Sequence, residues 1–148
     1  KKVITKFFES LKAKIKAKEA KTLREGKRVY PSNLRYAWVR ENDGADNDHF
    51  HVVIILNKDA FSVLGNFKST NANTAQRIKK AWCSALSCKE ESSDGLVHYA
   101  KKGVYILDKN ALSFNTTYSD LYFRISYFAK NRTKVYGTGK RSFGCSYK

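Results

Sequence analysis

The chain has 148 residues, of which 42% are hydrophobic and 14% aromatic, and this predicts a single domain over residues 1–148 with one core. Its 29 Lys and Arg against 13 Asp and Glu give a net charge of +16, which favours a nucleic acid over other polyanionic partners. No run approaches the roughly 18 apolar residues of a membrane span. Three cysteines without a CxxC pair argue against a zinc knuckle or a disulfide framework and fit a reducing cytoplasm.

The N-terminal segment predicts a basic amphipathic helix over residues 2 to about 24. Residues 1–28 contain eleven Lys or Arg and three Glu, a charge of about +8, so the polar side of this helix is a surface that can follow a phosphate backbone. The sequence contains no methionine, and we expect that an N-terminal piece of the full-length protein precedes it. The predicted apolar stripe consists of Ile4, Phe7, Phe8, Leu11 and Ile15.

Two strands joined by a polar turn are predicted next, over residues 34–41 and 49–56. If Glu41 lies opposite His49, Val39 faces His51, because an antiparallel pair keeps its register along both strands. Side chains alternate along a strand, so Glu41, His49 and His51 share one face, while the other face carries Trp38 and Phe50.

The remaining sequence predicts an α+β fold, in which a central antiparallel sheet is flanked by helices. A helix ending at about Leu86 is expected to be capped by Asn73 or Thr74 and to bury Ile78, Ala81, Trp82 and Leu86. The other predicted elements are a short helix over 60–64, strands over 96–100 and 103–106, and a helix over 121 to about 132 capped by Thr116 or Ser119.

The two same-face imidazoles are candidate metal ligands, with Glu41 as the third. Histidine nitrogen together with a carboxylate suits Mn²⁺ or Mg²⁺ when the substrate is a phosphodiester. Asp48 is a weaker candidate because it alternates to the face opposite His49, and His98 is a further alternative. The sequence therefore predicts a divalent metal at His49, His51 and Glu41.

Tyr127 is the candidate nucleophile, because Lys130 follows it at the spacing that makes side chains neighbours on a helix. A phenol with a pKa near 10 is a poor nucleophile, and an adjacent ammonium group stabilises the phenolate. Tyr118 and Tyr122, four residues apart, are alternatives on or near the same helix. This pattern predicts metal-assisted cutting of a nucleic-acid backbone, with a phosphotyrosine link as the intermediate.

The C-terminal segment is rich in basic and aromatic side chains. From residue 130 onward it holds six Lys or Arg and no acidic residue, which predicts contacts to phosphates. The candidate phosphate contacts are Arg132, Lys134, Lys140 and Arg141. Phe143 and Tyr147 are candidates for stacking on bases, whereas Trp38 is expected in the core.

The ordered motifs over residues 34–146 resemble the HUH endonucleases, the group of rolling-circle replication initiators and conjugative relaxases. More narrowly, they resemble the inovirus replication-protein and YagK/YfjJ family of phage and prophage proteins. The matching segments are Tyr36-Ala37-Trp38-Val39-Arg40-Glu41, His49-Phe50-His51-Val52, Leu56-Asn57-Lys58-Asp59-Ala60, Tyr127-Phe128-Ala129-Lys130, Thr133-Lys134 and Phe143-Gly144-Cys145-Ser146, with Gly137, Gly139 and Arg141.

The resemblance implies a nuclease domain with a sheet of about five antiparallel strands, a divalent metal at His49 and His51, and Tyr127 as nucleophile. It implies single-stranded or hairpin origin DNA as substrate, a host or phage helicase as partner, and the cytoplasm of a bacterial host as location. Two alternatives remain open from the residues alone. One is a non-catalytic DNA-binding protein of a mobile element, and the other is a membrane-surface protein that uses the basic N-terminal helix.

Overall fold

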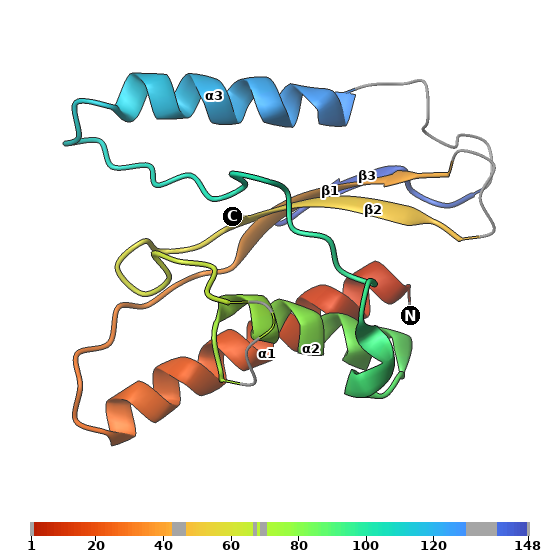
Figure 1. The fold of residues 1–148 in the computed structure, drawn as a ribbon, viewed down its shortest axis with the longest axis horizontal. Helices are drawn as coiled ribbons and strands as arrows, with labels where there is room; N and C mark the ends of the chain where they lie inside the picture. The colour runs from red at the N-terminus through yellow and green to blue at the C-terminus, as the bar shows by residue number, and fades with distance from the viewer. Residues whose placement is uncertain (1, 43–46, 67, 69–70, 130–138, 148) are drawn as a thin grey trace. The chain divides into compact units, whose positions relative to one another are not determined.

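The computed structural model of the protein describes residues 2–42, 47–66, 68, 71–129 and 139–147. The chain divides into two compact units, one of residues 1–32 and 57–104, the other of residues 33–56 and 105–148. Within the described residues there are three α-helices and a three-stranded antiparallel sheet, which confirms the predicted α+β class (Figure 1).

The first unit is helical. Helix α1 (Val3–Arg24) packs against α2 (Thr74–Leu86), which is followed by the short 3-10 helix η1 (Glu90–Ser93). The predicted N-terminal helix and all five residues of its apolar stripe are confirmed, since each side chain of that stripe is at most 4% exposed. Phe7 meets the edge of Trp82 with 5.4 Å between ring centroids.

The buried side of α2 differs from the predicted stripe. Ala81 is buried as expected, but Leu86 is 39% exposed, and the other buried side chains include the small residues Ala75, Cys83 and Ala85. Small side chains on α2 leave room for the phenylalanines of α1. The volume of a side chain, and not only its hydrophobicity, therefore decides which residues of α2 are buried.

Asn73 caps α2, which confirms one of the two predicted caps. Its side-chain oxygen accepts a hydrogen bond of 2.9 Å from the backbone N–H of Gln76. Thr74 instead donates its hydroxyl to the carbonyl of Val63 at 3.0 Å. The cap satisfies one of the backbone donors that the first turn of a helix leaves without a partner.

The second unit contains the sheet, with strands β1 (Arg35–Glu41), β2 (His49–Ile55) and β3 (Phe143–Cys145) in the order β2-β1-β3. The predicted hairpin and its register are confirmed: Glu41 pairs with His49, and Val39 pairs with His51. On the other side of β1, Val39 pairs with Phe143. A row across the sheet therefore runs from Phe143 through Val39 to His51.

The strands predicted over 96–100 and 103–106 do not form, and this whole segment is irregular. A strand requires a partner for its backbone hydrogen bonds, and here Lys102, with φ of 50°, turns the chain between the two expected strands. The segment is anchored by Tyr99, whose hydroxyl donates to the carbonyl of Ala75 at 2.7 Å. Burial raises the pKa of Tyr99 to about 12.

The short helix predicted over 60–64 is a turn instead. The carbonyl of Asn57 accepts hydrogen bonds from the backbone N–H groups of Ala60 and Phe61, and the side-chain oxygen of Asn57 accepts one from the backbone N–H of Asp59. An asparagine that binds its own following backbone favours a turn, and five residues are too few to nucleate a stable helix.

The third helix begins and ends earlier than predicted. Helix α3 spans Phe114–Ser126, and the 3-10 helix η2 (Tyr127–Ala129) follows it. Ser113 precedes the first turn, so the prediction that Thr116 or Ser119 caps the helix is wrong. The first turn of α3 contains polar residues. Such residues are favoured there because the backbone N–H groups of a first turn have no acceptor within the helix. Tyr127 therefore lies in the tighter turn after the α-helix rather than within it.

None of the helices in the described part of the chain has the length and apolar character needed to cross a membrane.

Candidate functional site

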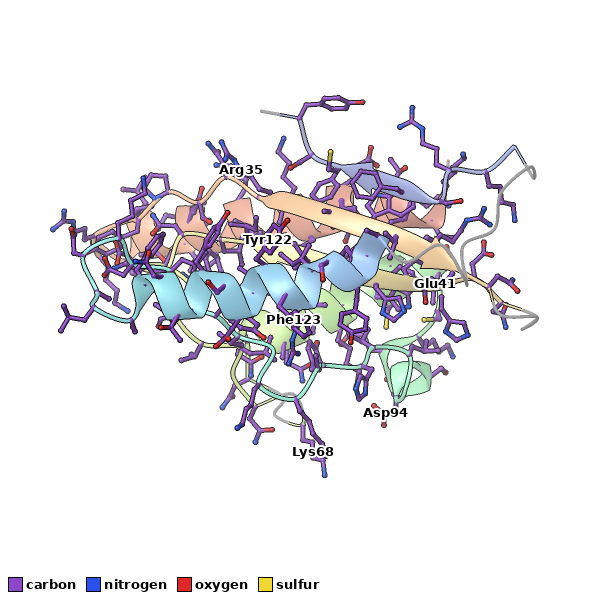
Figure 2. All side chains as sticks on the ribbon, turned by 90° about the horizontal axis from the view of Figure 1, so that it is seen from above. Arg35, Glu41, Lys68, Asp94, Tyr122 and Phe123 are labelled. Atoms are coloured by element: carbon purple, nitrogen blue, oxygen red, sulfur yellow. The ribbon has the colours of Figure 1, made fainter. Side chains whose placement is uncertain are left out.

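Three candidate metal ligands lie on one face of the β1–β2 hairpin, which we call the histidine face: Glu41, His49 and His51. The register of the two strands places them there. Nε2 of His51 lies 3.0 Å from Oε2 of Glu41, while His49 is exposed at the start of β2. The side chain of His51 is 57% exposed and that of Glu41 is 21% exposed. The structure therefore joins Glu41 and His51 as a pair, with His49 on the same face. Figure 2 shows Glu41 at the end of β1.

The donor types on the histidine face fit a divalent cation, since imidazole nitrogen and carboxylate oxygen are ligands for Mn²⁺ and Mg²⁺. In this arrangement Glu41 and His51 contact each other, and an ion would take the place of their hydrogen bond. Within the residues that the structure describes, no cluster of three or more His, Cys, Asp or Glu side chains is arranged to hold a metal ion. The metal site therefore stays a prediction.

Asp48 is engaged elsewhere. Its carboxylate accepts hydrogen bonds of 3.1 and 3.2 Å from Nη1 of Arg40, and it also accepts one from Asn42. Partial burial raises the pKa of Asp48, but the hydrogen bonds from Asn42 and Arg40 and the charges of Arg40 and Lys140 outweigh it, so the pKa lies below its usual value. Asp48 therefore acts as the anion partner of Arg40.

Arg40 donates hydrogen bonds to the backbone of residues 140–142, the segment that leads into β3. It is 4% exposed, and its guanidinium donates from Nε to the carbonyl of Arg141 at 3.1 Å and from Nη2 to the carbonyl of Lys140 at 3.3 Å. Its backbone N–H donates to the carbonyl of Ser142 at 2.8 Å. This role was not predicted, although an arginine within a hydrophobic strand is a signal for it, because a buried guanidinium requires several acceptors.

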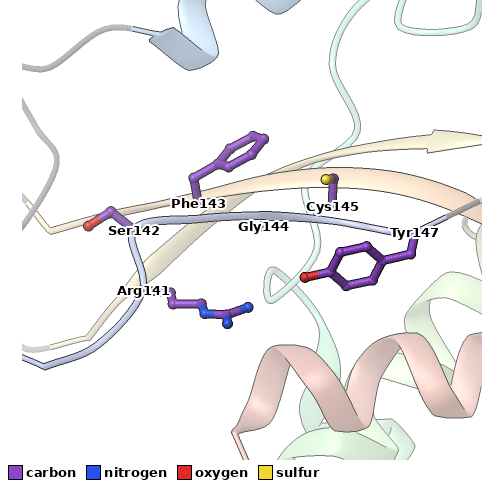
Figure 3. Close-up of a pocket in the computed structure, with 6 residues that line it drawn as sticks. All are labelled: Arg141, Ser142, Phe143, Gly144, Cys145 and Tyr147. Atoms are coloured by element: carbon purple, nitrogen blue, oxygen red, sulfur yellow. The ribbon is translucent and has the colours of Figure 1, made fainter.

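Two of the four candidate phosphate contacts are described. The side chain of Lys140 is 63% exposed, with Nζ 3.8 Å from Asp48, and Arg141 is exposed. Figure 3 shows Arg141 and Tyr147 on one side of β3 and Phe143 and Cys145 on the other. With Ser142 and Gly144 these residues line a shallow, open hollow of about 350 Å³. Arg132 and Lys134 lie outside the described residues.

The turn of Tyr127 lies beside the histidine face. The ring of Phe128, the next residue, is 6.5 Å from the ring of His51 between centroids. Tyr127 is 55% exposed and meets the ring of Phe123 edge-on at 5.9 Å. The structure therefore brings Phe128, the residue after the predicted nucleophile, to His51, whereas the ring of Tyr127 contacts Phe123. The position of Lys130, the predicted neighbour of Tyr127, lies outside the described residues.

The alternatives named from the sequence fall in other places. Tyr118 and Tyr122 are 51% and 67% exposed. Both lie on α3, before the turn in which Phe128 contacts His51. His98 belongs to the first unit, whereas the histidine face belongs to the second. Trp38 is 8% exposed, which confirms that it is a core residue.

Comparison with known proteins supplies a family. Residues 1–146 match the YagK/YfjJ C-terminal domain. The chain is 38% identical over 144 residues to the uncharacterized protein YagK of Escherichia coli strain K12, covering 97% of this chain and 69% of that protein. It is 40% identical over 147 residues to the uncharacterized protein YfjJ of the same strain, covering 97% and 70%. No solved structure matches. The chain belongs to the YagK/YfjJ C-terminal domain family.

Proposed function

We propose that this protein is an HUH-type endonuclease, which nicks and rejoins single-stranded DNA at an origin and so starts rolling-circle replication of a phage, satellite or prophage element. The observation that carries the proposal is the approach of Phe128 to His51, with 6.5 Å between ring centroids. Residues 128 and 51 are far apart in sequence, and their contact supports a site in which Tyr127 acts beside the paired Glu41 and His51. A nucleophile and its metal ligands need that proximity.

The chemistry follows from the groups on this face. A divalent ion held by Glu41, His49 and His51 supplies polarisation of the scissile phosphate when bound. The Oη atom of Tyr127 forms a bond to phosphorus while one phosphorus–oxygen ester bond breaks, and the phenolic proton passes to the departing deoxyribose oxygen. Lys130 is proposed to stabilise the phenolate and the charge on the phosphate. Because the phosphotyrosine link conserves a phosphodiester bond, the reverse reaction rejoins the strand.

The substrate is proposed from charge and from the exposed basic residues. Lys140 and Arg141, together with Arg132 and Lys134, are the proposed phosphate contacts, and the net charge of +16 favours a polyanion. The proposal extends to an HUH-like sheet of about five strands, to a helicase as partner and to a bacterial cytoplasm as location.

The test uses a labelled single-stranded oligonucleotide that carries the hairpin-forming DNA next to the coding region. With Mn²⁺ present, we expect cleavage and a covalent protein–DNA adduct that survives denaturing electrophoresis, and we expect chelation to abolish both and added Mn²⁺ to restore them. Tyr127→Phe removes the nucleophile and should abolish the adduct. Tyr118→Phe and Tyr122→Phe are matched controls on α3 that should form it normally.

The metal ligands have a test that does not depend on cutting. Titration of Mn²⁺ into the protein, followed by calorimetry, should give one site that is weakened by about 10-fold or more in Glu41→Gln, His49→Ala and His51→Ala. If no origin DNA is cut and His49→Ala binds both DNA and Mn²⁺ like the parent, the alternative of a non-catalytic DNA-binding protein replaces the nuclease.

A further inference from the structure

Two half-buried basic side chains come together where α1 packs against α2, and we call them the cation cluster: Lys18 of α1 and Arg77 of α2. Phe7, early in α1, contacts Trp82, late in α2. Lys18, late in α1, is within electrostatic range of Arg77, early in α2. The two helices are therefore antiparallel, and the whole cluster belongs to the first unit (Figure 1).

Lys18 is held in place by the segment that follows β2. Its Nζ donates to the carbonyl of Ala60 at 3.1 Å and lies 4.4 Å from the centroid of the Phe61 ring. The same segment reaches α2, because the carbonyl of Leu64 accepts a hydrogen bond of 2.8 Å from the backbone N–H of Ala75. An ammonium group has three N–H donors, and the bond to Ala60 uses one of them.

The guanidinium of Arg77 has no anion of the protein to balance its charge. In the part of the chain that the structure describes, no hydrogen bond or ion pair of this side chain is found. Burial lowers the pKa of Arg77. Burial, and after it the charge of Arg77, lower the pKa of Lys18. Both effects disfavour the charged form, so the free protein holds these two charges at a cost.

Glu19 does not neutralise the cation cluster, although its charge acts on Lys18. Its carboxylate accepts hydrogen bonds of 2.8 Å from the backbone N–H of Ser32 and 2.9 Å from Nζ of Lys16. The attraction of Glu19 is weaker than the repulsion from Arg77, and the pKa of Lys18 stays lowered. Because Glu19 and Lys16 compensate each other, two positive charges remain in the cluster.

Packing of the arginine stem alone does not explain this arrangement. An arginine commonly buries its aliphatic stem and leaves its charged head in water. Here the head of Arg77 lies near a second cation in a partly desolvated place, where each charge opposes the other. Charged groups held against their own preference are typical of sites that a ligand completes.

We infer that the cation cluster binds a phosphate group, with Arg77 as a two-pronged donor and Lys18 as a second positive charge. A guanidinium group matches two oxygens of a phosphate, and an ammonium group adds a point charge. A free phosphate ion and a phosphodiester of a nucleic-acid backbone offer the same oxygens, and the experiment distinguishes these sources. The site is independent of the proposed nuclease, because both of its residues belong to the first unit.

Thermal unfolding tests the site directly. Circular dichroism is recorded while sodium phosphate replaces sodium chloride at constant ionic strength, since a ligand that binds only the folded state raises the Tm. Arg77→Met keeps a good helix former but removes the guanidinium. Its phosphate-dependent rise in Tm should be smaller than that of the parent by about 2 °C or more. In chloride alone its Tm should equal or exceed that of the parent, because the repulsion of Lys18 is gone.

Arg28→Met is the matched control, because it removes an exposed arginine from the same unit. Its phosphate-dependent rise in Tm should equal that of the parent. The comparison also corrects for the general stabilisation by phosphate, which is excluded from protein surfaces. Arg77→Lys keeps the charge without the fork and should retain part of the rise. In nuclear magnetic resonance spectra, the Nε–H signal of Arg77, assigned by its absence in Arg77→Lys, should shift saturably with phosphate.

A second arm identifies the source of the phosphate group. A fluorescein-labelled oligothymidine is titrated with protein in EDTA and chloride, and dissociation constants are obtained from anisotropy. If Arg77→Met binds it about 5-fold or more weakly than Arg28→Met, the cluster takes a phosphodiester of the nucleic-acid backbone. If the two variants bind it equally while only Arg77→Met loses the response to phosphate, the cluster takes a free phosphate ion.

Three results overturn the inference. One is an equal phosphate-dependent rise in Tm for the parent and Arg77→Met, or an equal reduction in Arg77→Met and Arg28→Met, which would assign the effect to net charge. Another is an Nε–H signal of Arg77 that does not respond to phosphate. The third is a lower Tm of Arg77→Met than of the parent in chloride, because Arg77 would then stabilise the free protein. None of these results depends on DNA cutting, so the proposed nuclease is judged separately.

Discussion

At the residue scale, Gly144 shows how closely β3 approaches the core. It pairs with Trp38, and a Cβ atom built on Gly144 would lie 2.6 Å from Cε2 of the indole ring. The ring is rigid and 8% exposed, so it cannot move aside cheaply. Gly144→Ala should therefore lower the free energy of unfolding by about 1–3 kcal/mol through overpacking.

Urea denaturation in a Trp82→Phe background measures this effect, because the remaining tryptophan, Trp38, then reports on the second unit. Cys145→Ala is the matched control on the same strand, since that side chain is exposed, and it should change the free energy of unfolding by no more than about 0.5 kcal/mol. Equal stability of the two variants would mean that the indole ring does not constrain position 144.

The free energy of unfolding should depend on pH through Asp48, and the direction of that dependence follows from its pKa. Its pKa is lowered in the folded protein, so its stabilising contribution is fully present above the unfolded value of about 4 and is lost as the pH falls through the lower folded pKa. Asp48→Asn should cost about 1–2 kcal/mol of unfolding free energy at pH 7. The difference from the parent should shrink in urea denaturation series carried from pH 5 towards pH 2.

Asp120→Asn is the control for this series, because it removes an exposed carboxylate from α3. The parent and that variant should differ by no more than about 0.5 kcal/mol at pH 7. A gap between the parent and Asp48→Asn that stayed constant down to pH 2 would show that the carboxylate charge does not carry the interaction with Arg40.

At the scale of elements, the cap of α2 tests whether local chemistry sets the beginning of a helix. Asn73→Ala removes the acceptor for the N–H of Gln76 and the donor to the carbonyl of Asn66, at 2.9 and 2.8 Å. We expect a loss of about 1 kcal/mol or more in thermal or urea denaturation. Asn73→Ser keeps a capping acceptor and should lose less, and equal losses would assign the effect to the bond with Asn66.

The elements that the sequence predicts correctly are those specified by a local pattern. The period-3.6 stripe of α1 and the alternation in β1 and β2 each repeat over several residues, so both the elements and the register of the hairpin could be predicted. The segment 96–106 has strand-like composition without a partner strand, and α3 begins among polar residues that favour caps. Both depend on tertiary context, which overrides propensity.

The same distinction applies to the candidate site. Glu41 could be placed beside the histidines because the turn and the alternation fix the register, and the structure joins it to His51 at 3.0 Å. The role of Arg40 could not be predicted, because its acceptors at residues 140–142 are about 100 positions away. The approach of Phe128 to His51 is long-range as well and follows from no local pattern.

At the scale of the whole molecule, the positive charge is unevenly divided between the two units. The first unit contains 19 basic and 7 acidic residues, for +12, and the second contains 10 and 6, for +4. The proposed catalytic groups belong to the second unit, whereas most of the charge belongs to the first. Long-range attraction of DNA should therefore depend on the first unit, and the reaction on the second.

The salt dependence of DNA binding tests this division. Lys6→Gln/Lys12→Gln removes two exposed lysines of α1 without touching the histidine face. The slope of log Kd against log salt concentration should decrease by about 1 for each phosphate that the variant no longer neutralises, and affinity should fall equally for all DNA sequences. Lys89→Gln/Lys101→Gln removes the same charge from the first unit outside its α-helices. If the two double variants have equal slopes, the attraction comes from net charge, and α1 makes no direct phosphate contacts.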